Sequence, residues 1–168
     1  MAAPDKIILD ATCGGRMMWF DKKHPNALYV DRRTLPLGAI EAQPGFSVEP
    51  DEIVDFTNMP YASRSFKLVV FDPPHIRQSG GEESIMGMKY GVLEDTAWEP
   101  VIVAGLSECW RVLSDYGVLI FKWAEVSVTV RQVLDLLPAE ISPLFGHTTG
   151  KSGKTKWICF MKFPKEDL

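Results

Sequence analysis

The sequence predicts an open α/β domain, in which helices cover both faces of a mostly parallel sheet. Short apolar runs alternate with segments of helical spacing, which is typical of β-α units joined by right-handed crossovers. The strand-like runs are also nearly continuous in apolar residues, as in strands that are buried on both faces. In such sheets ligands bind at the carboxyl ends of the strands. The residues that follow each strand are therefore the candidates for function.

The first part of the chain contains four predicted strands. Their ranges are 6–12, 27–31, 52–57 and 67–72. A short helix is expected at 16–23, between the first two strands. Proline and glycine recur in residues 32–52, which predicts a loop before the third strand.

The second part of the chain begins with a long connection at 75–93, where Gly80 and Gly81 suggest a mobile lid, with an ordinary surface loop as the alternative. Apolar residues then recur with helical spacing from about Asp95 to Leu113. The remaining predicted elements are a strand at 116–123, a helix at 128–137 that Pro138 ends, a candidate strand at 142–148 and a last strand at 156–163.

Composition limits the classes of function. The 168 residues suit one domain, 1–168, and leave no room for a separate target-recognition domain. The net charge of −4 argues against a strongly basic nucleic-acid binder, although a local basic patch stays compatible with it. The three cysteines, Cys13, Cys109 and Cys159, are far apart and form no CxxC pair, so neither a disulfide framework nor a metal site is expected.

The sequence also suggests a location. The N-terminus lacks the pattern of a signal peptide, and no apolar run approaches the roughly 20 residues of a membrane span. We therefore expect a cytoplasmic protein without a membrane partner.

Four predicted strands end in an acidic residue: Asp10, Asp31, Asp55 and Asp72. Asp31 follows Asp10 by about the 20 residues that place a carboxylate on the ribose hydroxyls of a nucleoside ligand. Gly14 and the glycine after it allow the backbone to turn tightly beside such a ligand, although the G-x-G-x-x-G fingerprint is missing. Each aspartate alone has a plainer interpretation as a cap of the next turn. Together they predict a nucleoside site at one edge of the sheet.

A second phosphate-binding candidate fails on spacing. Residues 146–155 contain two Gly-Lys pairs, but Phe145 and Thr148 stand where a P-loop needs its first glycine. The segment also precedes a strand instead of opening a helix. We expect a hairpin-like loop whose lysines can still contact phosphates.

These features resemble a class I S-adenosylmethionine-dependent methyltransferase of the kind that methylates exocyclic amines, most of all small phage and prophage proteins. "DATCGGRM" is similar to the cofactor loop, "DPPH" to the [DNS]-P-P-[YFWH] motif, and "LIFKW" and the segment 145–162 to late segments of those proteins. The resemblance implies a Rossmann-like sheet with an antiparallel last strand, and S-adenosylmethionine as cofactor. The cofactor contacts it implies are Asp10, Ala11, Thr12, Cys13, Gly14, Asp31, Asp55, Phe56 and Asp72.

The same resemblance assigns the chemistry to Asp72, Pro73, Pro74 and His75. An exocyclic amine is a poor nucleophile, because its lone pair is delocalised into the ring. Asp72 and the Pro73 carbonyl can each accept one N–H, and the rigid prolines hold these acceptors in place. His75 occupies the position of an aromatic ring that stacks on the extruded base, with a simple capping histidine as the alternative.

The departures from the family pattern concern the loop and the substrate. Arg16 replaces an expected glycine of the loop, which puts its cofactor contacts in doubt. The predicted substrate contacts are Lys89, Tyr90, Lys122 and Trp123, with core packing as an equal alternative for Trp123.

The sequence thus predicts methyl transfer to a nucleobase amine in DNA or RNA, first adenine N6 and then cytosine N4. The acidic charge keeps a small-molecule or protein substrate open as an alternative. A further alternative is a cofactor-binding subunit that needs a protein partner for target recognition. Neither the biological role nor the oligomeric state follows from the sequence.

Overall fold

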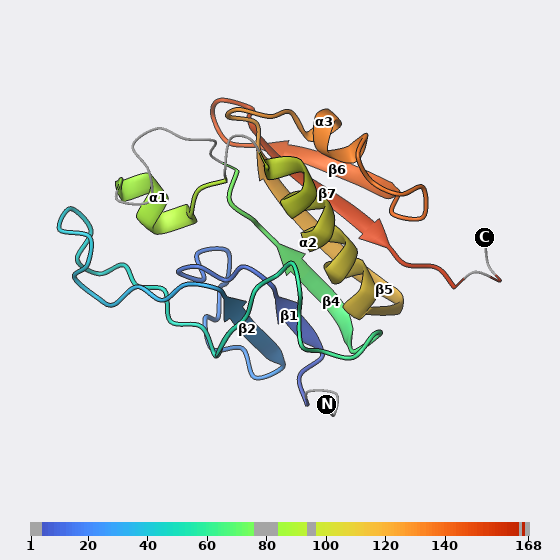
Figure 1. Cartoon of the computed structure of the whole chain (residues 1–168). Helices are drawn as coiled ribbons and strands as arrows, with labels where there is room; N and C mark the ends of the chain where they lie inside the picture. Colours follow the sequence, from blue (N-terminus) through green and yellow to red (C-terminus); the bar gives the residue numbers. More distant parts are fainter. Residues whose placement is uncertain (1–4, 76–83, 94–96, 165, 167–168) are drawn as a thin grey trace.

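Seven strands form one mixed sheet, and Figure 1 labels all of them except β3. In chain order they are β1 (Ile8–Asp10), β2 (Ala27–Asp31), β3 (Glu52–Ile53), β4 (Phe66–Phe71), β5 (Leu113–Ala124), β6 (Pro143–Thr149) and β7 (Thr155–Met161). Their order in the sheet is β3-β2-β1-β4-β5-β7-β6. The strands from β3 to β5 pair in parallel, whereas β7 is antiparallel to both of its neighbours. The predicted open, mostly parallel sheet with an antiparallel last strand is confirmed.

This computed structural model describes residues 5–75, 84–93, 97–164 and 166. The predicted lid glycines, Gly80 and Gly81, lie outside these ranges, so the lid stays a prediction.

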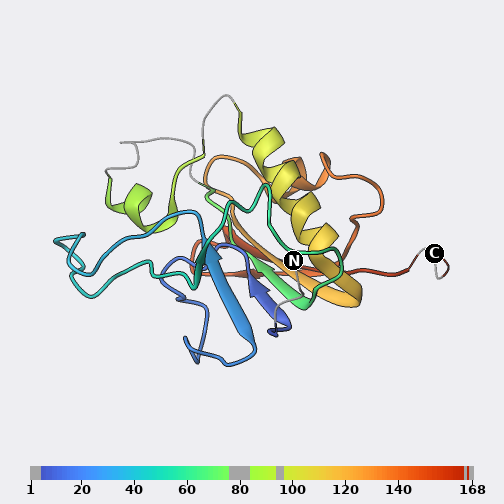
Figure 2. The same ribbon diagram turned by 60° about the horizontal axis from the view of Figure 1, so that its bottom comes forward.

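The described helices are α1 (Ile85–Tyr90), α2 (Trp98–Val112) and α3 (Val130–Leu134). α2 and α3 lie on the same side of the sheet, with α2 along β4 and β5 (Figures 1 and 2). α1 stands apart from the sheet on the side of β2 (Figure 1). The main apolar core therefore lies between α2, α3 and one face of the sheet.

Burial along β5 shows how the two faces differ. Leu119, Phe121 and Trp123 are fully buried against the helices, while the intervening Val118 and Ile120 are half-buried. β2, in contrast, is buried along its whole length. Both β2 and β5 are nearly continuous in apolar residues. Of these two strands, only β2 is buried on both faces, as such a run predicts.

The predicted helix at 16–23 is wrong, because this segment forms successive turns. Arg16 has a φ of 53°, in the left-handed region that an α-helix cannot use. Its backbone N–H donates to the Cys13 carbonyl, and the Trp19 N–H donates in turn to the Arg16 carbonyl. Successive turns, and not a helix, therefore reverse the chain before β2 begins.

Other elements differ in length from the prediction. The expected strand at 52–57 is only the two residues of β3, and the expected helix at 128–137 is the five residues of α3. α3 begins at a complete capping box, in which Thr129 and Gln132 bond to each other's backbone N–H. The candidate strand at 142–148 is present as β6, so the chain ends in a β6–β7 hairpin.

Candidate functional site

The carboxyl ends of β2, β1 and β4 bring three acidic residues to one edge of the sheet. Asp10 ends β1 and pairs in register with Tyr29 of β2 and Val70 of β4. Asp31 ends β2, and Asp72 follows β4. This is the convergence that the sequence predicted from the strand ends.

A small hollow of about 50 Å³ lies at this edge. Its lining includes most of the predicted cofactor and substrate residues: Thr12, Cys13, Gly14, Asp31, Phe56, Asp72, Pro74, Lys89, Tyr90 and Lys122. Ligand pockets usually enclose about 300–1,000 Å³. A nucleoside cofactor therefore requires the side chains of α1, which form one wall, to move outward.

The loop after β1 is tied to β2 by its backbone. Gly14 has a φ of 47°, and its N–H donates to Asp31 Oδ2 at 3.1 Å. The Cys13 N–H donates to the Val30 carbonyl at 2.9 Å. A left-handed residue is needed at this turn, which explains the glycine. The loop backbone is thus fixed beside the Asp31 carboxylate.

Asp10 lies beneath this loop and does not line the hollow. It is fully buried, and its carboxylate accepts the Trp19 indole N–H at 2.7 Å and the Thr12 backbone N–H at 3.3 Å. Burial raises the pKa of Asp10 to about 7, with smaller contributions of the same sign from Asp72 and Asp31. Asp10 therefore supports the loop from below.

Five other predicted site residues also lie outside the lining of the hollow: Ala11, Asp55, Pro73, His75 and Trp123. Ala11 and Trp123 are fully buried, and the Trp123 indole donates to the Val128 carbonyl at 2.8 Å. Asp55 is exposed and accepts both the backbone N–H and the hydroxyl of Thr57, as a turn cap does. For Asp55 and Trp123, the plainer interpretations that the sequence left open, a turn cap and core packing, describe the contacts better.

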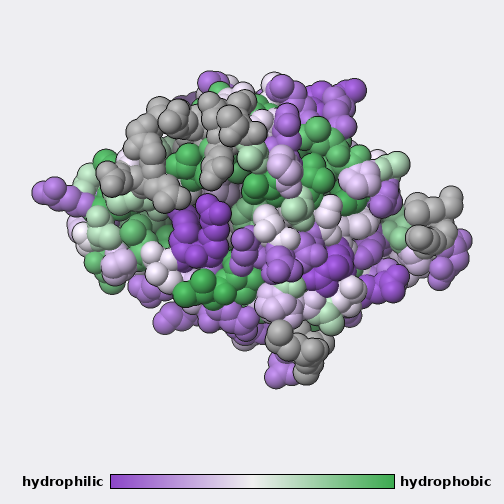
Figure 3. All heavy atoms as spheres, viewed as in Figure 1, coloured by the Kyte–Doolittle hydropathy of each residue, from purple (hydrophilic) through white to green (hydrophobic). Residues whose placement is uncertain are grey.

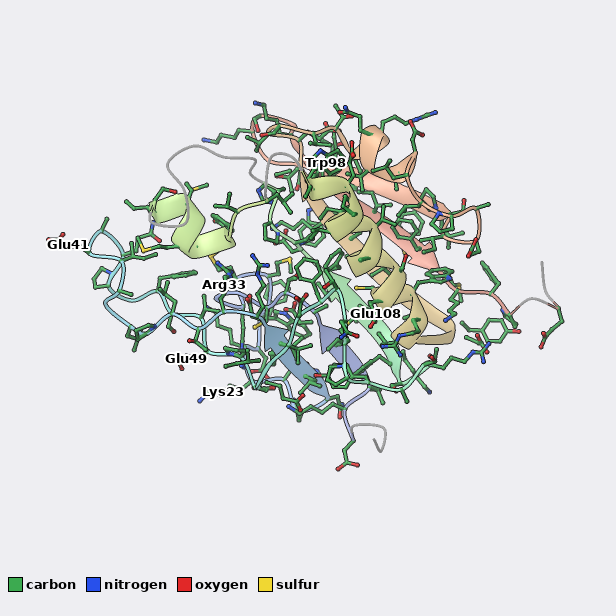
Figure 4. All side chains as sticks on the ribbon, viewed as in Figure 1. Lys23, Arg33, Glu41, Glu49, Trp98 and Glu108 are labelled. Carbon is green, nitrogen blue, oxygen red and sulfur yellow. The ribbon has the colours of Figure 1, made fainter. Side chains whose placement is uncertain are left out.

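Arg33 is outside the predicted set of site residues, although the sequence offers the pair Arg32-Arg33 as a candidate for contact with phosphate, with a solvated strand end as the alternative. Its side-chain Nε donates to Asp31 Oδ1 at 3.2 Å, and its Nη1 donates to the Met88 carbonyl in α1 at 3.2 Å. Figure 4 shows Arg33 below α1, and Figure 3 shows strongly hydrophilic atoms in the same region. One guanidinium thus joins the predicted ribose acid to the wall of the hollow. The only sequence signal was a basic residue two positions after a strand-end acid.

Asp72 forms the most direct contact between two predicted site residues. Lys122, on β5, donates to Asp72 Oδ2 at 2.5 Å, and Thr12 Oγ1 accepts the Asp72 backbone N–H at 2.8 Å. The other carboxylate oxygen, Oδ1, is buried and has no hydrogen-bond partner among the described residues. A buried acceptor without a partner is costly in a folded protein. This oxygen is therefore available to an N–H of a ligand.

His75 lies next to this acceptor. It is 9% exposed, and its Nδ1 also lacks a partner within the described part of the chain. Its ring centroid lies 6.1 Å from those of both Tyr90 and Trp123. Burial lowers the pKa of His75 despite the opposing effect of Asp72, so the imidazole is neutral at pH 7. Two buried polar atoms of the D-P-P-H segment, Asp72 Oδ1 and His75 Nδ1, thus have no hydrogen-bond partner within the described residues.

Three expectations from the sequence can be compared with the described residues. Residues 146–155 join β6 to β7 as a hairpin and open no helix, which agrees with the rejection of a P-loop. Within the described ranges no group of three or more His, Cys, Asp or Glu side chains could hold a metal ion. None of the described helices is both long and apolar enough to cross a membrane.

Comparison with solved structures supports the fold. A proposed methylase from Haemophilus influenzae superposes with a TM-score of 0.50 and 14% identity, over 95% of this chain and 88% of its own. The N-methyltransferase NodS from Bradyrhizobium japonicum also superposes with a TM-score of 0.50 and 14% identity, over 94% and 84%. No protein-family model and no curated protein matches the sequence. The chain therefore has a class I methyltransferase-like fold.

Proposed function

We propose that the protein is an S-adenosylmethionine-dependent methyltransferase that acts on an exocyclic amine of a nucleobase in DNA or RNA, with adenine N6 preferred over cytosine N4. The observation that carries the proposal is the unpartnered, buried Asp72 Oδ1, held at the start of a rigid Pro-Pro turn beside the nucleoside-type edge of the sheet. The class I methyltransferase-like fold supports it.

The residues at the edge suit the cofactor. Asp31 offers carboxylate oxygens to ribose hydroxyls, Gly14 places backbone without a side chain next to them, and Phe56 supplies an apolar wall for an adenine. Bound S-adenosylmethionine supplies an electrophilic methyl group on a sulfonium. Arg33 must give up its contact with Asp31 when the ribose takes its place.

Asp72 and Pro73 would orient the amine. Asp72 Oδ1 accepts one N–H and the Pro73 carbonyl a second, so the nitrogen lone pair points away from both acceptors. Lys122 holds Oδ2 and thereby fixes the orientation of the carboxylate. The proton released by the methylated amine can pass to Oδ1.

The test separates transfer from cofactor binding. In the variant Asp72→Ala we expect labelled methyl transfer to an oligonucleotide to fall about 100-fold or more, because the orienting acceptor is lost. Cofactor affinity by calorimetry should stay nearly unchanged. Asp31→Ala should show the opposite pattern, with weaker cofactor binding. Normal turnover by the Asp72 variant would refute its assignment.

A small-molecule or protein substrate is the second candidate, and the net charge of −4 favours it. Mass spectrometry of nucleosides from cells with and without the protein distinguishes the two. An unchanged nucleoside profile, together with cofactor binding by the pure protein, would favour the second candidate.

A further inference from the structure

A second and much larger hollow, of about 880 Å³, lies beside the cofactor loop. It shares Gly14, Gly15 and Met17 with the small hollow, so the two adjoin. Its other walls are the turn at 22–25 and the loop at 43–51, and Figure 4 shows Lys23 and Glu49 on this side of β2. Its volume is typical of a ligand site, and the cofactor edge does not use it.

The charge of this hollow is opposite in sign to that of the chain. Its lining contains the four cations Lys6, Arg16, Lys22 and Lys23 but only the two carboxylates Glu49 and Asp51. The hollow thus has an excess of two positive charges in a chain whose net charge is −4. A local excess of this sign attracts anionic ligands.

The internal ion pairs occupy two of these cations. Asp51 binds Lys6 at 3.1 Å and Arg16 at 2.9 Å. Arg16 also donates to the carbonyls of Lys22 and Glu49 and stacks 3.9 Å above the Tyr29 ring. Arg16 therefore acts as a clamp that fixes the shape of the hollow.

Lys22 and Lys23 remain without a carboxylate. Lys22 Nζ bonds only to the Gly15 carbonyl at 3.2 Å, and neither lysine forms an ion pair within the described residues. These two ammonium groups are the ones that an anion can reach without breaking an internal pair.

An aromatic ring marks the boundary between the two hollows. Phe46 is half-buried and lies directly on Gly15, where an added Cβ would come within 2.5 Å of the ring. On the side of the small hollow, Lys89 Nζ lies 5.2 Å from the Phe46 ring centroid. Basic side chains interleaved with aromatic rings are the usual elements of a single-strand binding groove.

We propose that this hollow holds the phosphodiester backbone of the nucleic-acid strand whose target base enters the small hollow. Lys22 and Lys23 contact phosphates, and Phe46 stacks on a base next to the target. The inference rests on the proposed function and specifies where its substrate lies. It also explains how an acidic protein can bind a polyanion.

The experiment measures the salt dependence of binding. A fluorescent 20-nucleotide single strand, as DNA and as RNA, is titrated with the protein by anisotropy between 25 and 200 mM salt. In the double variant Lys22→Gln/Lys23→Gln, the slope of log K against log[salt] should become shallower by about 1.4, at about 0.7 per lost phosphate contact on a single strand. Phe46→Ala should weaken binding about tenfold without changing the slope.

The matched control removes two exposed cations that line neither hollow, as Arg64→Gln/Arg131→Gln, and its slope should equal that of the wild type. An unchanged slope in the Lys22/Lys23 variant, or an equal loss in the control, would overturn the inference. Competition by pyrophosphate as effective as that by an excess of unlabelled strand would also overturn it, since the site would then be one for a free anion. Cofactor calorimetry on the same variants keeps the two proposals apart, because cofactor binding and methyl transfer can persist when the slope does not respond.

Discussion

The substitution Asp10→Asn tests the electrostatics beneath the cofactor loop. Burial raises the pKa of Asp10 from 3.8 to about 7 in the folded protein. The folded protein therefore binds a proton that the unfolded chain releases, and its stability must decrease as the pH rises from about 4 to about 7. Above pH 7 the loss is complete, because the carboxylate is then ionised in both states.

The magnitude follows from the two pKa values. Their separation of about 3 pH units corresponds to about 4 kcal/mol of lost stability at pH 8.5. An asparagine cannot ionise, so it avoids this loss, and its amide oxygen can still accept the Trp19 N–H. Its NH₂ group cannot accept the Thr12 N–H, and the loss of this hydrogen bond lowers the stability of the variant by about 1 kcal/mol. We expect Asp10→Asn to be about 3 kcal/mol more stable than the wild type at pH 8.5 and about 1 kcal/mol less stable at pH 4, where only the lost hydrogen bond counts.

Urea unfolding at several pH values between 4 and 8.5 measures the difference. Glu41→Gln, an exposed substitution in the loop before β3, is the matched control and should follow the wild type throughout. A difference between Asp10→Asn and the wild type that is the same at pH 4 and pH 8.5 would show that Asp10 does not carry this pH dependence.

Three further variants test the packing around the site. Gly105→Ala places a Cβ 2.7 Å from the Phe56 ring, so we expect a loss of about 1–2 kcal/mol in urea unfolding, net of the gain in helix propensity, and weaker cofactor binding; an unchanged affinity would mean that Phe56 does not contact the adenine. Trp19→Phe removes the N–H that stabilises ionised Asp10, so it should destabilise the protein by about 1–2 kcal/mol more at pH 8.5 than at pH 4. Equal losses at the two pH values would show that this hydrogen bond does not stabilise the ionised carboxylate. Arg111→Met leaves two loop carbonyls without their donor, and the urea midpoint should fall by an amount equivalent to about 1–3 kcal/mol, whereas a change below about 0.5 would show that water replaces the guanidinium.

The fold was predictable where burial controls the sequence. β2 was predicted at its observed bounds, because a strand buried on both faces must be apolar throughout and ends visibly at Asp31. α2 was found within a few residues for the same reason, since its buried face recurs with helical period. The segment at 16–23 failed because its conformation depends on the contact of Arg16 with Asp51, 35 residues away. Local spacing contains no information about such a contact.

The location of the site was predictable from the sequence, but the contacts between its residues were not. The strand-end rule located Asp31 and Asp72 at one edge, and the end of β5 brought Lys122 to the same edge. The rule could not tell that Asp10 is beneath the loop, since that depends on the Trp19 indole filling the space a helix would occupy. The contact between Arg33 and α1 was equally hidden, because it joins residues 55 positions apart.

The position of Arg33 has a consequence for the order in which ligands can enter. Its guanidinium has one set of partners on Asp31 and another on the carbonyls at the end of α1. When a ribose takes over Asp31, the guanidinium keeps the α1 carbonyls as partners. The exchange therefore leaves no buried charge without a hydrogen-bond partner. α1 then stays bonded to Arg33 but is no longer tied through it to the Asp31 carboxylate, which loosens one wall of the small hollow. Under the proposed function, this side chain therefore favours binding of the cofactor before the nucleotide.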